Sequence, residues 1–223
     1  MLLLAVDTSG RHGGVALCRG DDKGFETLRL CALEGGTYSA RLVPCIADLL
    51  EQANLSKTQL DVLVVVDGPG SFTGLRVGLA TVKALCEVMR KPLAAVSMLE
   101  ALAITYGHDG DTGKAVLDAG RGEVYVGEYE THKGGAQLNH QSIEKLDGFL
   151  ARLPENSRIV TTFPKLAEGT LAPEVTLVSP LTADAVARIG LRKLLAGETA
   201  DPATLDANYI RRSDAELFSP PKR

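Results

Sequence analysis

A glycine-rich turn that follows an almost wholly apolar segment is the feature that most constrains the fold of this chain. The run "LDVLVVV" at residues 60–66 has the length of a strand and is too short to cross a bilayer. Such a run is typical of a strand covered on both faces of its sheet. The stretch "DGPGSFTGLRVGLA" follows at residues 67–80 and leads into a predicted helix from Ser71 to Met89. Strand, tight turn and helix in this order indicate an α/β protein.

The glycine-rich stretch does not match the loops that it superficially resembles. A P-loop needs a lysine directly after its last glycine, but Leu75 follows Gly74. A dinucleotide-binding loop needs a third glycine where this chain has Thr73. A nucleophile elbow needs glycines two residues on either side of Ser71, where the chain has Pro69 and Thr73. The stretch therefore predicts neither a phosphate loop with a lysine nor a catalytic serine.

An architectural role remains for this stretch. Because they lack side chains, Gly74 and Gly78 let the helix lie close to another backbone, at some cost in helix propensity. An anion bound at the start of the helix is the alternative, but the loop offers no lysine to hold it. The turn that we expect to be structural comprises Gly68, Pro69, Gly70, Ser71, Gly74 and Gly78.

The rest of the chain repeats one pattern of strands and helices. In the first half we expect strands at 2–9, 13–20, 25–33, 60–66 and 92–97, and helices at 37–55, 71–89 and 99–106. In the second half we expect strands at 114–120, 122–130, 137–143, 157–162 and 175–179, helices at 144–153, 163–171 and 182–197, and a surface tail from 201. Two consecutive β-β-β-α-β-α units indicate a duplicated fold. The polar stretch 107–113 separates them, so we expect subdomains at 1–107 and 108–223.

Composition limits the function classes. A net charge of −4, with aromatic residues at 4% and no Trp, argues against nucleic-acid binding as the main activity, so any RNA contact is expected through a partner. The apolar segment at the start of the sequence is interrupted early by Asp7, which argues against a signal peptide and a membrane anchor. No CxxC spacing occurs, which argues against zinc and thioredoxin chemistry and favours the cytoplasm. The four cysteines are Cys18, Cys31, Cys45 and Cys86.

Four segments resemble one protein family. "GPGSFTGLRVGLATVKAL" resembles the signature segment of the TsaB (YeaZ) family, which is the non-catalytic partner in the synthesis of threonylcarbamoyladenosine on tRNA. "LLLAVDTS", with "GGVAL" after it, "LDAGRGEVYVGEY" and "YIRRSDAEL" resemble further segments of that family. Gly10 and Gly120 depart from it, since the family often has Thr and Arg there. The resemblance implies the duplicated actin-like (ASKHA, RNase H-like) fold.

The resemblance also implies where a nucleotide would bind in active proteins of this fold. There an opening Asp-containing loop binds phosphate and magnesium, and Asp7, Thr8 and Ser9 match that loop. We interpret them as vestigial, because Asp at a strand end is often a turn cap. "DAG" at 118–120 resembles the second turn of the fold. The glycine pair that holds adenosine has no counterpart, since "TTFPKLAEGTLAP" offers only Gly169.

A second comparison concerns metal binding. The catalytic paralogue, TsaD, carries two metal-binding histidines spaced HxxxH, which can reach one metal from successive helical turns. The same positions here hold Met98 and Leu102, which cannot replace histidine. We therefore expect no catalytic residue, no metal site and no cofactor. An ATPase, a kinase or a peptidase in its own right is the alternative.

The helices at 37–55 and 71–89 each carry two apolar stripes, although one suffices to bury a helix against its own core. Either the two helices cover each other, or they meet another molecule. The resemblance implies the second explanation: a TsaD-like catalytic paralogue as partner, a TsaE-like P-loop ATPase joining the complex, and a possible homodimer. The expected partner-binding residues are Leu42, Ile46, Leu49, Leu50, Leu75, Leu79, Val82 and Met89. The second stripe of each helix comprises Val43, Ala47 and Leu50, and Val77, Thr81, Ala84 and Val88.

Overall fold

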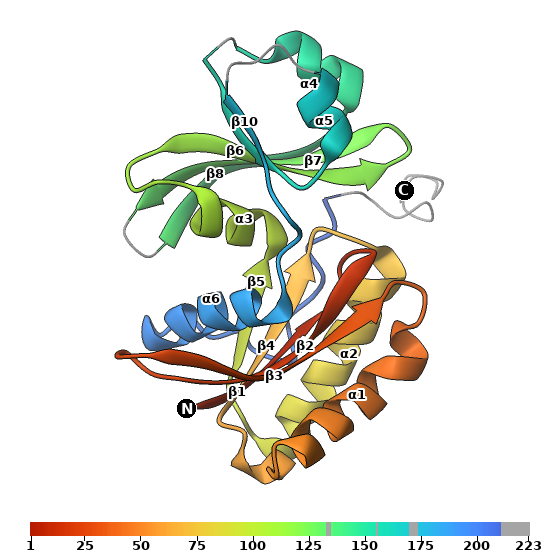
Figure 1. Ribbon diagram of the computed structural model, residues 1–223, viewed down its shortest axis with the longest axis vertical. Coiled ribbons are helices and arrows are strands. Elements are labelled where there is room, and N and C mark those ends of the chain that lie inside the picture. The colour runs from red at the N-terminus through yellow and green to blue at the C-terminus, as the bar shows by residue number, and fades with distance from the viewer. Residues whose placement is uncertain (133–134, 155, 170–173, 211–223) are drawn as a thin grey trace, which may run out of the picture.

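The protein consists of two α/β units, one above the other in Figure 1. The computed structural model describes residues 1–132, 135–154, 156–169 and 174–210. The first half contains β1 (Leu2–Asp7), β2 (His12–Gly20), β3 (Phe25–Glu34), α1 (Tyr38–Gln52), β4 (Val62–Gly68), α2 (Phe72–Met89), β5 (Leu93–Ser97) and α3 (Met98–Tyr106), with a short 3-10 helix at Lys57–Gln59. The second half contains β6 (Thr112–Gly120), β7 (Glu123–His132), β8 (Gly135–Lys145), α4 (Leu146–Arg152), β9 (Arg158–Thr161), α5 (Pro164–Gly169), β10 (Glu174–Leu177) and α6 (Ala183–Leu195).

The two sheets have the same strand order and the same directions. The first sheet runs β3-β2-β1-β4-β5, with β1 antiparallel to β2 and parallel to β4, for example with Leu4 opposite both Leu17 and Leu63. The second sheet runs β8-β7-β6-β9-β10, with β6 antiparallel to β7 and parallel to β9. This repetition confirms the duplicated actin-like (ASKHA, RNase H-like) fold. Each half has the order β-β-β-α-β-α-β-α, so the strand and helix that we expected after each β-β-β-α-β-α unit are present.

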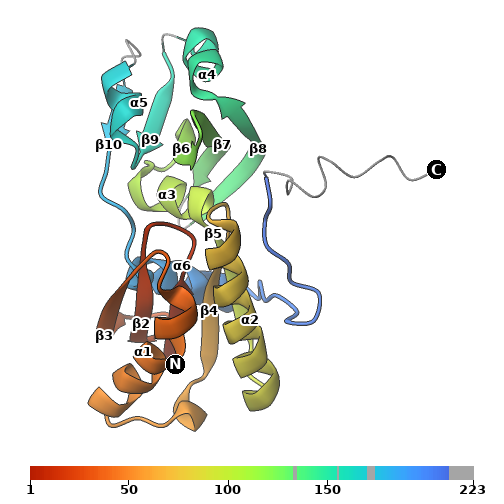
Figure 2. The same cartoon turned by 90° about the vertical axis from the view of Figure 1, so that its right-hand side faces the viewer.

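The last helix of each half covers the sheet of the other half. α3 packs on β6, β7 and β8, whereas α6 returns to pack on β1, β2, β4 and β5. Gly190 makes the return of α6 close, because a Cβ there would lie 2.4 Å from a methyl carbon of Val64. Figure 2 shows α1 and α2 side by side on one face of the first sheet and α6 on the other. The proposed boundary at 107/108 lies between α3 and β6 and stays a prediction.

Burial is deepest in the first sheet. All six residues of β1 and the first five of β4 are buried, as expected for strands covered on both faces. A smaller cluster forms the outer core of the second unit, with Val116, Val124, Val126, Phe149, Ile159 and Leu166. Within the described parts of the chain, no helix is long and apolar enough to cross a membrane.

Candidate functional site

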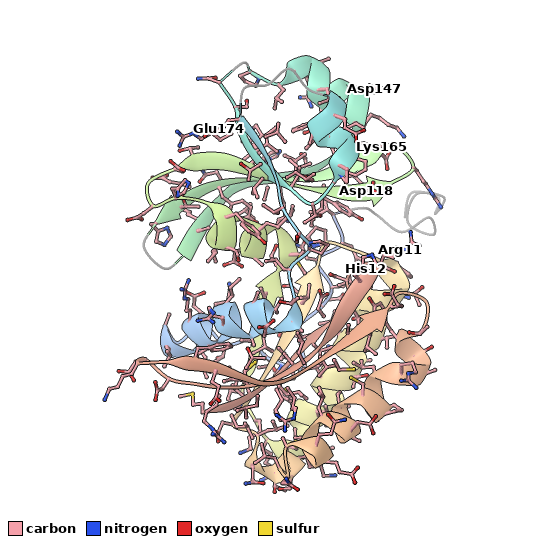
Figure 3. All side chains as sticks on the ribbon, viewed as in Figure 1. Arg11, His12, Asp118, Asp147, Lys165 and Glu174 are labelled. Atoms are coloured by element: carbon pink, nitrogen blue, oxygen red, sulfur yellow. The ribbon has the colours of Figure 1, made fainter. Side chains whose placement is uncertain are left out.

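The two units face each other across a cleft built from strand ends and turns. Its wider part has a volume of about 800 Å³ and is lined by residues of the β1–β2 turn, the start of α2, the β6–β7 turn and the segment 208–210. A second part, of about 280 Å³, reaches Asp7, Met98 and Leu102. Figure 3 shows Arg11 and His12 on the first unit and Asp118 on the second unit, on opposite sides of the cleft.

Asp7 ends β1 and is 2% exposed. Its Oδ1 accepts hydrogen bonds from the backbone N–H of Ser9 at 2.8 Å and from the Ser9 hydroxyl at 2.7 Å. Burial raises the pKa of Asp7, and the two hydrogen bonds from Ser9 act in the opposite direction. The Thr8 hydroxyl donates to the carbonyl oxygen of Gly74 at 2.7 Å. The polar groups of residues 7–9 are thus used to hold the loop and to attach it to α2.

The glycines of the signature turn lie directly against this loop. A Cβ at Gly70 would lie 2.2 Å from the carbonyl oxygen of Ser9, and a Cβ at Gly74 would lie 2.1 Å from that of Thr8. A Cβ at Gly78 would lie 2.2 Å from the Thr8 hydroxyl oxygen. These distances are far below van der Waals contact, so any side chain at these three positions would push α2 away from the opening loop.

Hydrogen bonds fix the start of α2 in the same place. The backbone N–H of Ser71 donates to the carbonyl oxygen of Ser9 at 2.6 Å, and the Ser71 hydroxyl caps the helix by accepting from the N–H of Gly74 at 3.3 Å. Gly68 has a φ of +140°, and a Cβ there would lie 2.8 Å from the carbonyl oxygen of Asn208. Pro69 follows Gly68, and its ring nitrogen has no hydrogen to donate.

The segment after α6 closes the cleft on the α2 side. The Asn208 N–H donates to the carbonyl oxygen of Asp67 at 2.8 Å, and the Lys83 ammonium donates to the carbonyl oxygen of Leu205 at 2.7 Å. The expected surface tail therefore follows α2 as far as Ile210. The expectation for the remainder of the tail lies outside the described residues.

The β6–β7 turn is the counterpart of the β1–β2 turn in the duplicated fold. Asp118 Oδ1 accepts the N–H of Gly120 at 2.8 Å. Gly120, Arg121 and Gly122 have φ values of +71°, +56° and +72°. A left-handed position suits glycine, which gives a physical reason for Gly120 where the family often has arginine. The turn places Arg121 beside the cleft.

Met98 and Leu102, where the resemblance places the histidine pair of TsaD, carry apolar side chains in the cleft wall. Met98 is 8% exposed and Leu102 is fully buried, and both line the same recess as Asp7 and Asp118. Across residues 1–132, 135–154, 156–169 and 174–210, no three His, Cys, Asp or Glu side chains group as metal ligands would. Among the described residues that line this recess, the one histidine is His12, whose Nδ1 lies 3.4 Å from Oε2 of Glu34 on the surface. The segment 161–173, in which we expect no adenosine-binding glycine pair, lies partly outside the described residues, since 170–173 are not among them.

Asp67, near the end of β4, is a half-buried acid that sequence reasoning did not single out. Its Oδ1 is buried without a hydrogen-bond partner in the part of the chain that the structure describes. The pKa of Asp67 is raised to about 6, first by burial and then by the charge of Glu100 on α3, while Lys193 on α6 acts in the opposite direction. Lys193 and Glu100 form an ion pair at 2.9 Å that joins the two exchanged helices. The only sequence signal was an Asp at the end of an apolar strand.

The expected partner-binding side chains lie in the core of the chain itself. Seven of the eight are buried, and Met89 is half-buried. The outer surface of these helices is formed instead by members of the second stripe, with Val43 60% exposed, Val88 77% exposed, and Ala47 and Ala84 also exposed. A partner that approaches α1 and α2 of this structure would meet the second stripe first. Which stripe binds a partner, and whether one binds at all, stays a prediction.

The chain resembles proteins of known families over most of its length. The model of the family TsaD: tRNA N6-adenosine threonylcarbamoyltransferase matches residues 35–199. The tRNA threonylcarbamoyladenosine biosynthesis protein TsaB of Bacillus subtilis is 36% identical over 134 residues, which cover 60% of this chain and 57% of that protein. TsaB of Escherichia coli is 34% identical over 162 residues, which cover 66% of this chain and 68% of that protein. The match thus spans little more than half of the B. subtilis protein.

A solved structure agrees at the level of the fold. The crystal structure of a Pseudomonas aeruginosa protein with similarity to peptidase YeaZ superposes with a TM-score of 0.76 at 23% identity, covering 94% of this chain and 99% of that one. The sequence matches, above all the one that covers 68% of the E. coli protein at 34% identity, show that the chain belongs to the TsaB (YeaZ) family.

Proposed function

We propose that this chain is a non-catalytic subunit of a tRNA-modifying complex. It binds and activates a TsaD-like catalytic paralogue that transfers threonylcarbamoyl to adenosine of tRNA, with a TsaE-like ATPase in the same complex. The observation that carries the proposal is the presence of Met98 and Leu102 at the positions of the histidine pair, both packed into the cleft wall. A thioether and an isobutyl group cannot supply the two imidazoles that hold the paralogue's metal.

The opening loop supports the same conclusion. One oxygen of the Asp7 carboxylate, Oδ1, accepts two hydrogen bonds from Ser9, which orient the carboxylate toward its own loop. Thr8 is likewise engaged with Gly74. These contacts favour a vestigial phosphate loop that now holds α2 in position. As part of the same proposal, we expect the chain to contact tRNA only through the complex and to act in the cytoplasm.

The exposed side of α1 and α2 is the proposed contact surface for the catalytic subunit. Val43 and Val88 expose large apolar side chains on helices whose other faces are already buried. Covering such side chains removes apolar area from water, which is the main favourable term in association. The same surface offers a place for a second copy of this chain, so a homodimer and the complex would compete for it.

The direct test is reconstitution of tRNA modification by the catalytic subunit with and without this chain. We expect activity only with it, and we expect Val43→Asp combined with Val88→Asp to abolish activation while the chain remains folded. A charge buried in an interface without a partner costs several kcal/mol, against roughly −8 kcal/mol for a micromolar association. Leu177→Asp, at a 50% exposed apolar residue of the other unit, is the matched control.

An enzyme in its own right is the second candidate, and purified protein separates the two. We expect neither phosphate release from ATP nor a stoichiometric metal by elemental analysis. Turnover that is lost in Asp7→Ala would overturn the scaffold proposal in favour of an ATPase or kinase. Peptide cleavage lost in Ser71→Ala or Asp7→Ala would favour a peptidase.

A further inference from the structure

Two of the four cysteines meet where helix α1 packs on the edge strand β3. Cys31 lies in β3 and Cys45 lies in α1, and α1 packs on β2 and β3. The two thiols are hydrogen-bonded to each other. The Cys31 thiol donates to the carbonyl oxygen of Ala32, with 3.7 Å between sulfur and oxygen, which leaves the Cys31 sulfur to accept the proton of Cys45. The two sulfur atoms are therefore neighbours before any reaction.

The direction of the Cys31 side chain follows from the strand. Side chains alternate along a strand, so Arg29, Cys31 and Leu33 share one face of β3. On that face, Arg29 Nη2 donates to the carbonyl oxygen of Gln52, the last residue of α1, at 3.1 Å. Leu33, two residues after Cys31, is buried. The face that carries Cys31 is therefore the face that α1 covers, and the contact with Cys45 follows from how the helix lies on the sheet.

The two thiols differ in their access to water. Cys31 is half-buried, in a strand at the edge of its sheet, whereas Cys45 is 3% exposed. Burial and the hydrogen bond with Cys31 raise the pKa of Cys45 to about 12, so that Cys45 stays protonated at neutral pH. A reagent dissolved in water thus meets Cys31 first and finds Cys45 directly behind it. An accessible sulfur with a second cysteine next to it is the arrangement of a redox-sensor cysteine and its resolving partner.

The other two cysteines are placed differently. Cys18 and Cys86 are fully buried or nearly so, at 0% and 2% exposure. The charges that act on Cys18 are those of Asp184 and Arg188, both on α6, so Cys18 lies toward the opposite face of the sheet from α1. Burial alone raises the pKa of Cys86, to about 11. Buried thiols of this kind are inert, so these two cysteines serve as internal controls.

We propose that Cys31 and Cys45 form a redox-sensitive pair, which hydrogen peroxide converts into a disulfide between β3 and α1. In the first step the Cys31 thiolate attacks the peroxide, an S–O bond forms, the O–O bond breaks, and the leaving hydroxide takes up a proton as water. In the second step the Cys45 sulfur attacks the resulting sulfenic acid, an S–S bond forms, the S–O bond breaks, and hydroxide leaves with the Cys45 proton as water. The two thiols are oxidised and the peroxide is reduced. Transient disulfides of this kind are the ones found in reducing compartments.

The disulfide would act on the surface that we propose for the catalytic subunit, and this part rests on the proposed function. Covalent contact between the sulfurs requires α1 to move closer to β3. Val43 and Ala47 lie two positions on either side of Cys45 and are exposed on the same helix. A surface formed jointly by α1 and α2 loses its fit when one helix moves and the other does not. Oxidation should therefore weaken the binding of the catalytic subunit, and reduction should restore it.

The first experiment treats the isolated full chain with hydrogen peroxide and then alkylates the remaining thiols under denaturing conditions. Mass spectrometry counts the alkylated cysteines and identifies cross-linked peptides. We expect the wild type to lose both thiols of the pair, to give a cross-link between Cys31 and Cys45, and to recover both thiols in dithiothreitol. Cys86→Ala, which removes a buried cysteine outside the pair, is the matched control and should form the same cross-link.

The two members of the pair should respond differently to removal of their partner. In Cys45→Ala, peroxide should still convert Cys31 into a sulfenic acid, which dimedone traps, and no cross-link should form. In Cys31→Ala, the buried Cys45 should keep its thiol. Circular dichroism checks the fold of each variant, and the corresponding serine variants repeat the test if an alanine variant is unfolded. The proposal is overturned if all four thiols survive a peroxide dose that oxidises a cysteine in a short peptide. A cross-link between two chains instead of within one, seen by non-reducing electrophoresis, overturns it as well.

The second experiment measures binding to the catalytic subunit after the peroxide has been removed. We expect the oxidised wild type to bind about tenfold or more weakly than the reduced chain, and dithiothreitol to reverse the loss. Cys31→Ala should bind equally well before and after the treatment. Unchanged binding by a chain that carries the disulfide overturns the control of the contact surface. If the reduced chain does not bind at all, the proposed function is wrong, whereas the result on the isolated chain still decides whether the thiol pair exists.

Discussion

The two units share one strand order and differ in how their sheets are covered. The first sheet is enclosed by long helices: α1 and α2, of 15 and 18 residues, on one face and α6, of 13 residues, on the other. The second sheet has α3, of 9 residues, on one face, and its remaining helices, α4 and α5, have 7 and 6 residues. The same order of strands is thus compatible with a layer of long helices on the sheet and with a layer of short ones. The larger helix surface of the first unit supports the proposal that the partner binds there.

Exchange of α3 and α6 links two unequal units into one structure. Val186, Ala187 and Ile189 of α6 are buried against the first sheet, although they lie at the far end of the chain. A fragment of residues 1–107 would leave that face of β1 and β4 bare, and an exposed apolar sheet face cannot offset the entropy of folding. We expect this fragment to be unfolded or aggregated, which circular dichroism and size-exclusion chromatography would show.

Adding a peptide of residues 180–210 is the complement to that experiment. It should restore a soluble, folded first unit if α6 is the missing cover. A fragment 1–107 that is monomeric and melts cooperatively by itself would contradict this prediction, and would show that the proposed boundary separates two independent folding units.

The second prediction compares the inner and outer stripes of α2. Val82 is fully buried and Val88 is 77% exposed on the same helix. Val82→Asp places an unpaired charge in the core of the first unit, which should cost about 3–5 kcal/mol of unfolding free energy. Val88→Asp should change it by about 1 kcal/mol or less, chiefly through a charge near the helix C-terminus. Urea denaturation of the two variants checks this, and equal losses would contradict the assignment of inner and outer faces.

Much of the fold could be predicted from sequence, because burial in the core determines the spacing and the type of residues along each strand and helix. The apolar runs of β1 and β4 and the glycine-rich turn before α2 were informative, since both reflect local requirements of the chain. The choice between the stripes on α1 and α2 was not local. Both stripes are apolar, and which one faces the sheet depends on how the whole helix is rotated about its axis, which no single residue encodes.

The cleft shows the same limit. Asp7 and the glycines stood out because each belongs to a compact motif, whereas Arg11 and Arg121 line the same cleft from turns that are 110 positions apart in the sequence. Asp67, Glu100 and Lys193 lie on three different elements and meet only after α3 and α6 have been exchanged. A repeat of Gly-Arg in the two turns was the available signal for the first pair. For the acid at the junction, the sequence offers no more than an Asp at a strand end.

Glycines of the two units should respond oppositely to the same substitution. Gly74→Ala places a Cβ 2.1 Å from the carbonyl oxygen of Thr8, so the opening loop or α2 must move, at a cost of about 3 kcal/mol. Gly148→Ala, within α4, meets nothing within 4 Å and should stabilise by about 0.5–1 kcal/mol through helix propensity. Thermal denaturation measures both changes. If Gly74→Ala is as stable as wild type, the close approach of α2 to the opening loop is not an architectural constraint.

The smallest effect is expected at the junction between the units, where Asp67 faces Glu100 and Lys193, with Tyr129 nearby. The pKa of Asp67 is about 6 in the folded state, against an ordinary value of 3.8, so the folded state holds this proton more tightly than the unfolded state. The contribution of Asp67 to stability is therefore fully present below about pH 4 and is lost as the pH rises through 6. Above pH 6 the buried carboxylate costs at most about 3 kcal/mol, less what its residual contact with water relieves.

Replacing Asp67 with Asn removes the charge and keeps the shape, so Asp67→Asn should be more stable than wild type at pH 8, by roughly 1–2 kcal/mol, and no more stable at pH 4. Urea denaturation at intervals between pH 4 and 8 measures the difference, and Asp48→Asn, at an exposed position of α1, controls for the loss of one negative charge. A variant that is less stable than wild type at pH 8 would mean that the ionised carboxylate is held by Lys193 strongly enough to outweigh its burial. In that case the ion pair between α3 and α6 extends to Asp67, and the link between the two units is electrostatic at neutral pH, whereas the predicted result leaves apolar packing of the exchanged helices as the main link.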